Sequence, residues 1–277
     1  MNTGHQEENP QPVIVKGTLG FIAHRLGVPP WGQILVLALL AVIGLGYRHL
    51  DKMDEHFIAV DKTLATLPLG ISNTLLSQAQ TDVKLGRYDR ATRATEAAKA
   101  ILAKASVDKI AAPPGYFEEA LSAMNVMKAI ATDESFRGTV HGAQLLLADY
   151  RSALEPLPRG RPSTKTAKAT VLASEISQEK GTTLVFDSAN PDSELIKGPA
   201  ILQDLTIVAP HGGYILLDGL HLDTVVLVGV RVQYLGGPID LHYVRFVNCT
   251  FDSVPDGNGP RLIDYVALAQ NKLSTQS

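Results

Sequence analysis

An apolar run at residues 31–47, WGQILVLALLAVIGLGY, has no formal charge over its 17 residues. A helix of this length extends about 25 Å, which is the short end of what crosses a hydrocarbon core of about 30 Å. Trp31 and Tyr47 stand at its two ends, where aromatic side chains favour membrane interfaces. We therefore expect a single transmembrane helix at 31–47 and a membrane location.

The flanks of this run argue against a cleaved signal peptide. Thirty residues precede it, Glu7 and Glu8 among them, and no A-x-A site follows it. A buried helix of a soluble domain is the other alternative. Basic residues near the run show no usable bias between its two sides: Lys16, Arg25, Arg48, Lys52 and Lys62. The orientation in the membrane therefore stays undetermined.

The first thirty residues form a leader. Residues 1–12, MNTGHQEENPQP, are polar and interrupted by proline, which is typical of a disordered tail. Residues 18–26 fit either a short interfacial helix or a loosely ordered segment, because only two turns are available.

A heptad-spaced apolar seam follows the run. Its members are three or four residues apart: Leu50, Met53, Phe57, Val60, Leu64 and Leu67. We expect one continuous helix over about 31–67, ended by Pro68 and Gly70. The seam either packs on later helices of its own chain or pairs with a second copy. In the second case the helical stalk would make the protein a homo-oligomer.

Residues 71–104 are expected to form a helical hairpin that turns at KLGRYDRA, residues 84–91. Small and aromatic residues stand at positions that let two helices approach closely: Ala79, Gly86, Tyr88, Ala91 and Ala98. The segment resembles a single tetratricopeptide hairpin. A second unit would run into AAPP at 111–114, so the resemblance implies helical-hairpin geometry and not a solenoid array.

Two further helices are expected at 116–131 and 134–153, the second with an interruption near Gly138 and Gly142. Residues 48–154 would then form a helical stalk and an all-α bundle. Residues 155–170, EPLPRGRPSTKTAKAT, contain three prolines and no apolar periodicity, which is typical of a linker.

A weak internal repeat defines the C-terminal region, 171–277. The segments LQDLTIV, LDTVVLV and LHYVRFV begin at Leu202, Leu222 and Leu241, which are 20 and 19 residues apart. The match between the last two copies extends on both sides of these segments: Leu220 aligns with Ile239, Gly229 with Asn248, Val230 with Cys249 and Val232 with Phe251. Short strands repeated at this step predict a parallel β-solenoid in which equivalent residues stack.

At VRFVNCTF, residues 244–251, the repeat resembles the coils of pentapeptide-repeat and right-handed β-helix proteins. The resemblance covers about 198–252 and implies a right-handed solenoid. Strict A-(D/N)-L-x-x spacing is absent, so the DNA-mimic role of the pentapeptide family does not carry over. We expect a capping helix at 261–270, and residues 171–187 to cover the other end. The fold class is thus α plus β.

If this register holds, Gln203, Asp223 and His242 stack in one column. A second column would consist of Asp204, Thr224 and Tyr243. Such columns present carboxylates in β-helix enzymes that act on polysaccharide, but they also form the ordinary solvent side of a solenoid.

A metal site using His221, Asp223 and His242 is a weaker alternative to that solvent side, and His211 with its two glycines fits a plain turn. We therefore assign no catalytic, metal-binding or cofactor-binding residue and expect no cofactor. Cys249, the only cysteine, falls at an inward position and excludes an intrachain disulfide.

Charge argues against nucleic acid as a partner. The net charge is −3 for the chain, and residues 198–264 hold seven Asp against three Arg. The leading hypothesis is a membrane-anchored interaction or sensing scaffold without catalysis, whose partners are the bilayer and another protein. The alternatives are a membrane-tethered β-helix enzyme acting on polysaccharide and a membrane-perturbing effector switched by the solenoid.

Overall fold

The computed structural model describes residues 66–158, 163–167, 170–172, 175–176, 181–187 and 190–275. The expected leader (1–30), the transmembrane helix (31–47) and the seam up to Leu64 lie outside these residues. Within the described ranges, no helix combines the length and the apolar character needed to cross a membrane. All of the described residues belong to one compact unit.

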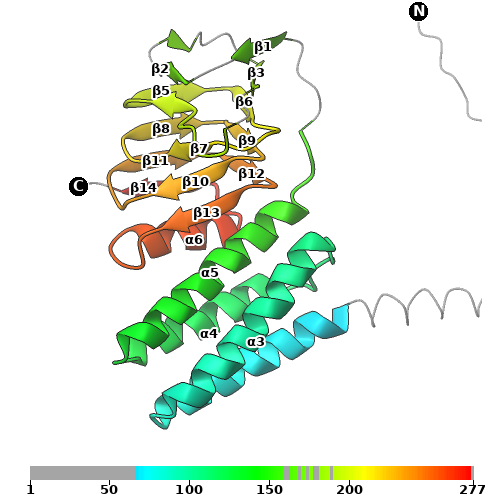
Figure 1. The fold of residues 1–277 in the computed structure, drawn as a ribbon, viewed down its shortest axis with the longest axis vertical. Helices are drawn as coiled ribbons and strands as arrows, with labels where there is room; N and C mark the ends of the chain where they lie inside the picture. Colours follow the sequence, from blue (N-terminus) through cyan, green and yellow to red (C-terminus); the bar gives the residue numbers. More distant parts are fainter. Residues whose placement is uncertain are drawn as a thin grey trace, which may run out of the picture. The chain divides into compact units, whose positions relative to one another are not determined.

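The first part of this unit is the predicted α-bundle (Figure 1). It consists of a helix over 66–84, then α3 (Tyr88–Val107), α4 (Tyr116–Ile130) and α5 (Glu134–Leu154). Asp133 caps α5 with a side-chain oxygen that accepts a hydrogen bond from the amide of Phe136.

The expected hairpin is confirmed. The helix over 66–84 turns at Gly86, whose φ of +70° is a left-handed conformation that favours glycine. Ala79, Ala91 and Ala98 are fully buried, because their small side chains let the two helices approach closely.

Two expected helix breaks are absent. Residues 66–84 are one helix, so the prediction that Pro68 and Gly70 end a helix is wrong. Burial of Leu69 and Leu76 on the bundle side offsets the missing amide and the flexible glycine. Likewise α5 runs without interruption through Gly138 and Gly142.

Leu67 is the one member of the apolar seam that the structure describes. It is 55% exposed, and Ile71, one turn later, is 48% exposed. The helix packs on the bundle through the opposite side, where Leu69 and Leu76 are buried. At Leu67, therefore, the seam is not part of the buried core of the bundle.

The second part is a parallel β-solenoid, as predicted (Figure 1). Its strands stack in sheets of order β1-β3-β6-β9-β12, β7-β10-β13 and β5-β8-β11-β14, beside a β2-β4 pair. The strands are β1 (Ser163–Ala167), β2 (Val171–Leu172), β3 (Thr182–Phe186), β4 (Ile196–Lys197), β5 (Ala200–Gln203), β6 (Leu205–Val208), β7 (Tyr214–Leu216), β8 (Leu220–Asp223), β9 (Val226–Val228), β10 (Arg231–Tyr234), β11 (Ile239–His242), β12 (Arg245–Val247), β13 (Thr250–Ser253) and β14 (Lys272–Thr275).

The register is the one that the repeat predicts. Leu222 pairs with Leu202 on one side and with Leu241 on the other. Ile207, Leu227 and Phe246 form an equivalent inward column, as expected for coils that add one strand to each sheet per turn.

A column of left-handed residues makes one corner of the coils. Gly181, Asp204, Thr224 and Tyr243 have φ values of 77°, 52°, 57° and 52°. The amides of Asp204 and Thr224 donate to the carbonyls of Asp223 and His242 in the next coil, and the amide of Tyr243 donates to Asn271 after the last. The corner thus repeats a backbone conformation without repeating a residue type.

The N-terminal end of the solenoid differs from expectation. The stretch 155–170, expected to be a linker, contains β1, which pairs in parallel with β3. Residues 171–187, expected to cover the end, instead supply β2 and β3, of which β3 joins the same sheet as β6. The threonine-rich STKTA of β1 has no apolar alternation, so only the neighbouring strand specifies it.

At the C-terminal end the expected capping helix is present as α6 (Gly259–Ala267), with Leu262, Ile263 and Tyr265 buried. The chain then adds β14, which pairs antiparallel with β11. This strand was not expected. It covers the edge of β11 and becomes the end strand of this sheet.

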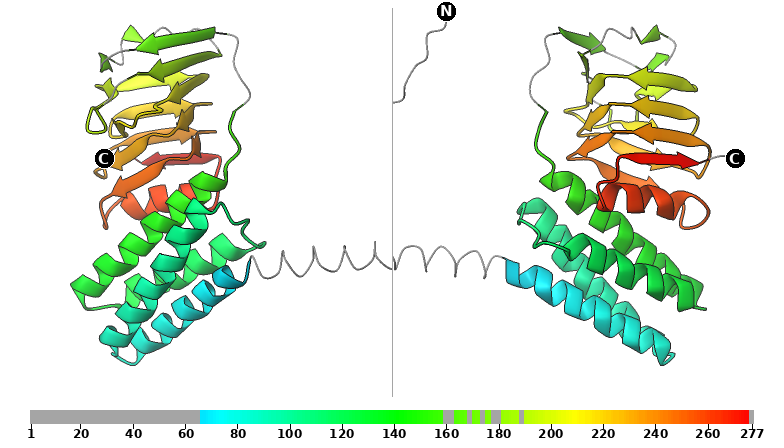
Figure 2. Two further views of the ribbon diagram at one scale, coloured as in Figure 1. Left: turned by 45° about the vertical axis from the view of Figure 1, so that its right-hand side comes forward. Right: turned by 180° about the vertical axis from the view of Figure 1, so that it is seen from behind.

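Helix α5 joins the bundle to the solenoid, and the views of Figures 1 and 2 agree that it lies along the last coil. The Asp149 carboxylate accepts from the amide of Phe251 at 2.8 Å. The Ser152 hydroxyl accepts a hydrogen bond from the backbone amide of Cys249, and the Ser152 carbonyl accepts one from the backbone amide of Asn248.

A third residue of α5 makes a similar contact. His141 Nε2 is hydrogen-bonded to the carbonyl of Ser253 at 2.7 Å. One face of α5 therefore satisfies backbone groups that the end of a solenoid leaves open.

Candidate functional site

The column predicted from the repeat lies on the outer face of the β5-β8-β11-β14 sheet. Gln203, Asp223 and His242 are paired in register, and Lys272 of β14 extends the column. The neighbouring outer column consists of Ile201, His221, Asp240 and Ser274. The structure thus brings together the residues expected there and adds a lysine from a strand that the sequence did not reveal.

Asp240 connects the two histidines of this face. Its carboxylate lies 2.9 Å from His221 Nδ1 and 3.0 Å from His242 Nε2, and the two imidazole rings are 5.7 Å apart. Asp223 accepts a hydrogen bond from the Thr224 hydroxyl instead. The three residues of the alternative metal site, His221, Asp223 and His242, therefore do not share one partner.

No group of three or more His, Cys, Asp or Glu in the described part of the chain is placed to hold a metal ion. The face has the acid–base groups for proton transfer, and it is the outer surface of a sheet. His211 also lies on the surface, 3.7 Å from Asp187, beside two glycines with positive φ.

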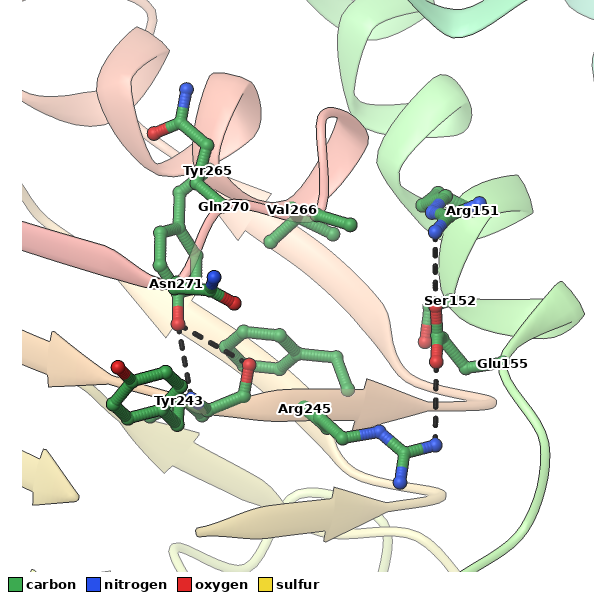
Figure 3. Close-up of a pocket in the computed structure, with 12 residues that line it drawn as sticks. Arg151, Ser152, Glu155, Tyr243, Arg245, Tyr265, Val266, Gln270 and Asn271 are labelled. Atoms are coloured by element: carbon green, nitrogen blue, oxygen red, sulfur yellow. Dashed lines mark hydrogen bonds and ion pairs between the residues drawn. The ribbon is translucent and has the colours of Figure 1, made fainter. Parts of the chain in front are cut away.

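A cavity of about 250 Å³ lies where α5, the last coil and the end of α6 meet (Figure 3). Its polar lining comes from all three elements: Arg151, Ser152, Glu155, Tyr243, Arg245, Gln270 and Asn271. Its apolar lining consists of Val244, Phe246, Tyr265, Val266 and Ala269. A concave apolar site with a few convergent polar groups is the usual form of a ligand pocket, and this cavity is a small one.

A carboxylate lies between two guanidinium groups in this pocket (Figure 3). Glu155 approaches Arg151 Nη2 at 3.2 Å through one oxygen and Arg245 Nη2 at 3.3 Å through the other. Arg245 Nη2 also donates to the carbonyl of Pro156. These contacts tie the end of α5 to β12 and hold both guanidinium groups beside the cavity.

The inner wall is held in place by Tyr265. Its hydroxyl donates to the carbonyl of Val244 and accepts from the amide of the same residue. Burial raises the pKa of Tyr265 to about 12, so the hydroxyl stays protonated at neutral pH. The wall is therefore neutral, and the charge of the pocket comes from its arginines and from Glu155.

Sequence reasoning missed this pocket. Its lining comes from α5, from a corner of the last coil and from the turn after α6, and none of these segments carries a recognisable motif. One feature of the sequence could have indicated a charged site here. Arg245 stands at a position of the repeat that holds the uncharged Thr206 and Val226 in earlier coils.

Cys249 is buried, as expected, and burial raises its pKa to about 11. The thiol is therefore an inert part of the core and not a nucleophile.

No family model, no curated protein and no solved structure matched this chain.

Proposed function

We propose that this chain is a membrane-anchored interaction protein without catalytic activity. In this proposal the α-bundle and the solenoid present to a partner the pocket between α5, the last coil and the end of α6, which we name the junction pocket. The observation that carries the proposal is the pocket itself, because its residues come from the bundle, the last coil and the cap. A site of this kind exists only when the three parts are assembled, as ligand pockets between structural units commonly are.

Three features support a binding role. The stacked coils belong to an architecture that commonly serves as an interaction surface. Helix α5 holds both parts together through Asp149 and Ser152. Tyr243 at the rim of the pocket is 61% exposed. A large aromatic side chain stabilises a complex when a bound partner covers it, so Tyr243 is suited to such a contact.

Membrane anchoring is tested by extracting membranes from cells that express the full chain. The full chain is expected to stay in the membrane pellet after alkaline carbonate treatment, and a variant that lacks residues 31–47 is expected to be released. Release of the full chain would remove the anchoring part of the proposal.

Interaction through the pocket is tested by site-specific photo-crosslinking in the native cells. A photoreactive phenylalanine analogue at Tyr243 is expected to give a discrete adduct with another protein. The same analogue at Leu235, which is 66% exposed but lies in the loop after β10, is the matched control. Equal labelling from both positions, or none from Tyr243, would contradict the proposal.

A second candidate function is a membrane-tethered enzyme acting on polysaccharide, and the group of His221, Asp240 and His242 favours it. These residues and Asp223 stand side by side on one sheet face, where an extended sugar chain could lie. Loss of a measured glycan-cleaving activity in Asp223→Asn and His242→Gln, with unfolding midpoints unchanged, would establish the enzyme and overturn the noncatalytic proposal.

A further inference from the structure

We propose that the junction pocket binds a carboxylate carried on a short apolar body, from either a small organic acid or the C-terminal residue of a peptide. The proposal rests on the interaction role proposed above, since it names the ligand chemistry of the same pocket. Its basis is the combination of two guanidinium groups with an apolar wall in one cavity of about 250 Å³.

The charge of the pocket favours an anion. Arg151 and Arg245 contribute two positive charges, and Glu155 contributes one negative charge, so the lining has an excess of one positive charge. A ligand with a single carboxylate would bring the site to neutrality. Removing such a ligand from water is favourable only where charge partners of this kind replace its hydration.

The guanidinium groups have donors left for a second carboxylate. Each contacts Glu155 through Nη2, whereas a guanidinium carries five N–H groups in a fixed planar fork. Arg151 Nε is buried and has no hydrogen-bond partner. The ring of Phe117 lies 5.2 Å from Arg151 Cζ and holds that side chain on α5. A bound carboxylate would supply the missing acceptors.

The remaining lining limits the body of the ligand. The cavity of about 250 Å³ is smaller than most ligand pockets, which favours a carboxylate on a short body. Phe246, Val266 and Ala269 provide an apolar surface for that body. Gln270 and Asn271 stand at the same cavity and offer amide groups to a polar substituent.

Two other cavities in the described residues provide a contrast. They lie on either side of α4, with volumes of about 470 and 490 Å³, and their charged lining consists of Glu118, Glu119 and Asp264. An acidic lining repels a carboxylate. The anion preference therefore belongs to the junction pocket and is not a general property of the surface.

The test measures binding calorimetrically to the full chain in nonionic detergent micelles. The first probe is 3-methylbutanoate, and 3-methylbutanamide is its neutral match. We expect the acid to bind at least tenfold more tightly than the amide. Arg151→Gln and Arg245→Gln should each weaken the acid at least tenfold, because each removes part of the fork that receives it.

Arg231→Gln is the matched control variant. Arg231 is exposed to a similar degree, pairs with Asp192 and lies beside the Tyr214 ring on a different sheet. It should bind the acid as the unmodified chain does. Glu155→Gln should bind severalfold more tightly, because the carboxylate that competes for the arginines is gone. Equal unfolding midpoints establish that the variants are folded.

Two peptides identify the source of the carboxylate. A tripeptide that ends in valine with a free carboxylate is compared with the same peptide amidated at its C-terminus. Tighter binding of the free peptide than of 3-methylbutanoate indicates a peptide terminus, and the reverse order indicates a small acid.

Three results would overturn the inference: equal binding of acid and amide, unchanged binding in both pocket arginine variants, or weaker binding in Glu155→Gln. Absence of acid binding at 10 mM to both the unmodified chain and Glu155→Gln would do the same. Crosslinking from Tyr243 does not depend on a carboxylate, so failure here would leave the interaction role standing.

Discussion

The bundle and the solenoid both bury apolar surface, but they do so in different ways. In the bundle each helix satisfies its own backbone, and close packing comes from small residues such as Ala79, Ala91 and Ala98. In the solenoid each coil depends on the next, so inward columns such as Leu202, Leu222 and Leu241 repeat, and the last coil needs a cover. The difference teaches that the two parts cannot be independent.

Helix α5 belongs to both. It buries Val140 and Leu147 in the bundle, while Asp149 and Ser152 receive amides of the last coil. The bundle thus supplies what the solenoid lacks at this end. This shared helix makes specific predictions, which run from the largest expected effect to the smallest.

The largest effect is expected from Leu227→Ala, in the middle of an inward column. Truncating a fully buried leucine costs about 2–5 kcal/mol through lost contacts and a cavity. Because α5 links the parts, we expect amide hydrogen exchange to accelerate in both β9 and α3. Leu235→Ala removes the same atoms from an exposed side chain and should change neither. Unchanged protection of α3 in Leu227→Ala would show that the bundle is independent.

Asp149→Asn is expected to change how stability depends on pH. Burial raises the pKa of the Asp149 carboxyl from 3.8 to about 7. The folded state therefore binds more protons than the unfolded state between about pH 4 and pH 7, and stability falls as the pH rises through this window. Each unit of this pKa shift corresponds to about 1.4 kcal/mol.

Asparagine keeps an acceptor for the Phe251 amide but cannot ionise. The variant should therefore be more stable than the unmodified chain at pH 8 and depend less on pH, as measured by unfolding midpoints from pH 4 to 8. Asp252→Asn, on the exposed side of β13, is the control. An identical pH profile in Asp149→Asn and the unmodified chain would refute this account of the junction.

Two glycines compare the turns of the two parts directly. Gly86 in the hairpin and Gly229 in a solenoid corner have φ values of 70° and 67°, so alanine costs about 1–2 kcal/mol at either from backbone strain alone. A Cβ on Gly86 meets nothing within 4 Å, but one on Gly229 lies 3.1 Å from the carbonyl oxygen of Ala209. Chemical denaturation should show the larger loss for Gly229→Ala, and equal losses would mean that the coils yield as easily as the hairpin.

The smallest effect on stability is expected for the seam. Because Leu67 is exposed, we expect the seam to pair with a second copy and not to enter the bundle. Phe57→Asp with Leu64→Asp should abolish crosslinking between copies that carry Asp54→Cys, and change the stability of the bundle by less than about 0.5 kcal/mol. Leu85→Asp, which is exposed but lies outside the seam, should leave crosslinking intact. Unfolding of residues 71–154 in the double variant would assign the seam to the core of the chain.

Much of the fold follows from local pattern. The hairpin around Gly86 and the register of Leu202, Leu222 and Leu241 could be predicted, because each depends on residues close in sequence or on a fixed repeat. The column of Gln203, Asp223 and His242 followed from that register. The strand β1 could not be predicted, since its Ser, Thr and Lys residues form a strand only against β3.

By itself, then, the sequence determined the helical hairpin, the stacked coils and the residues that share each column, because helix and strand periodicities are properties of the local chain. Only the tertiary structure decided how the ends of the stack are covered and where a pocket forms. Asp149 and Ser152 meet amides 102 and 97 residues later, and Glu155 meets Arg245 across 90. Such contacts depend on the direction in which whole elements pack, which no repeat or periodicity encodes.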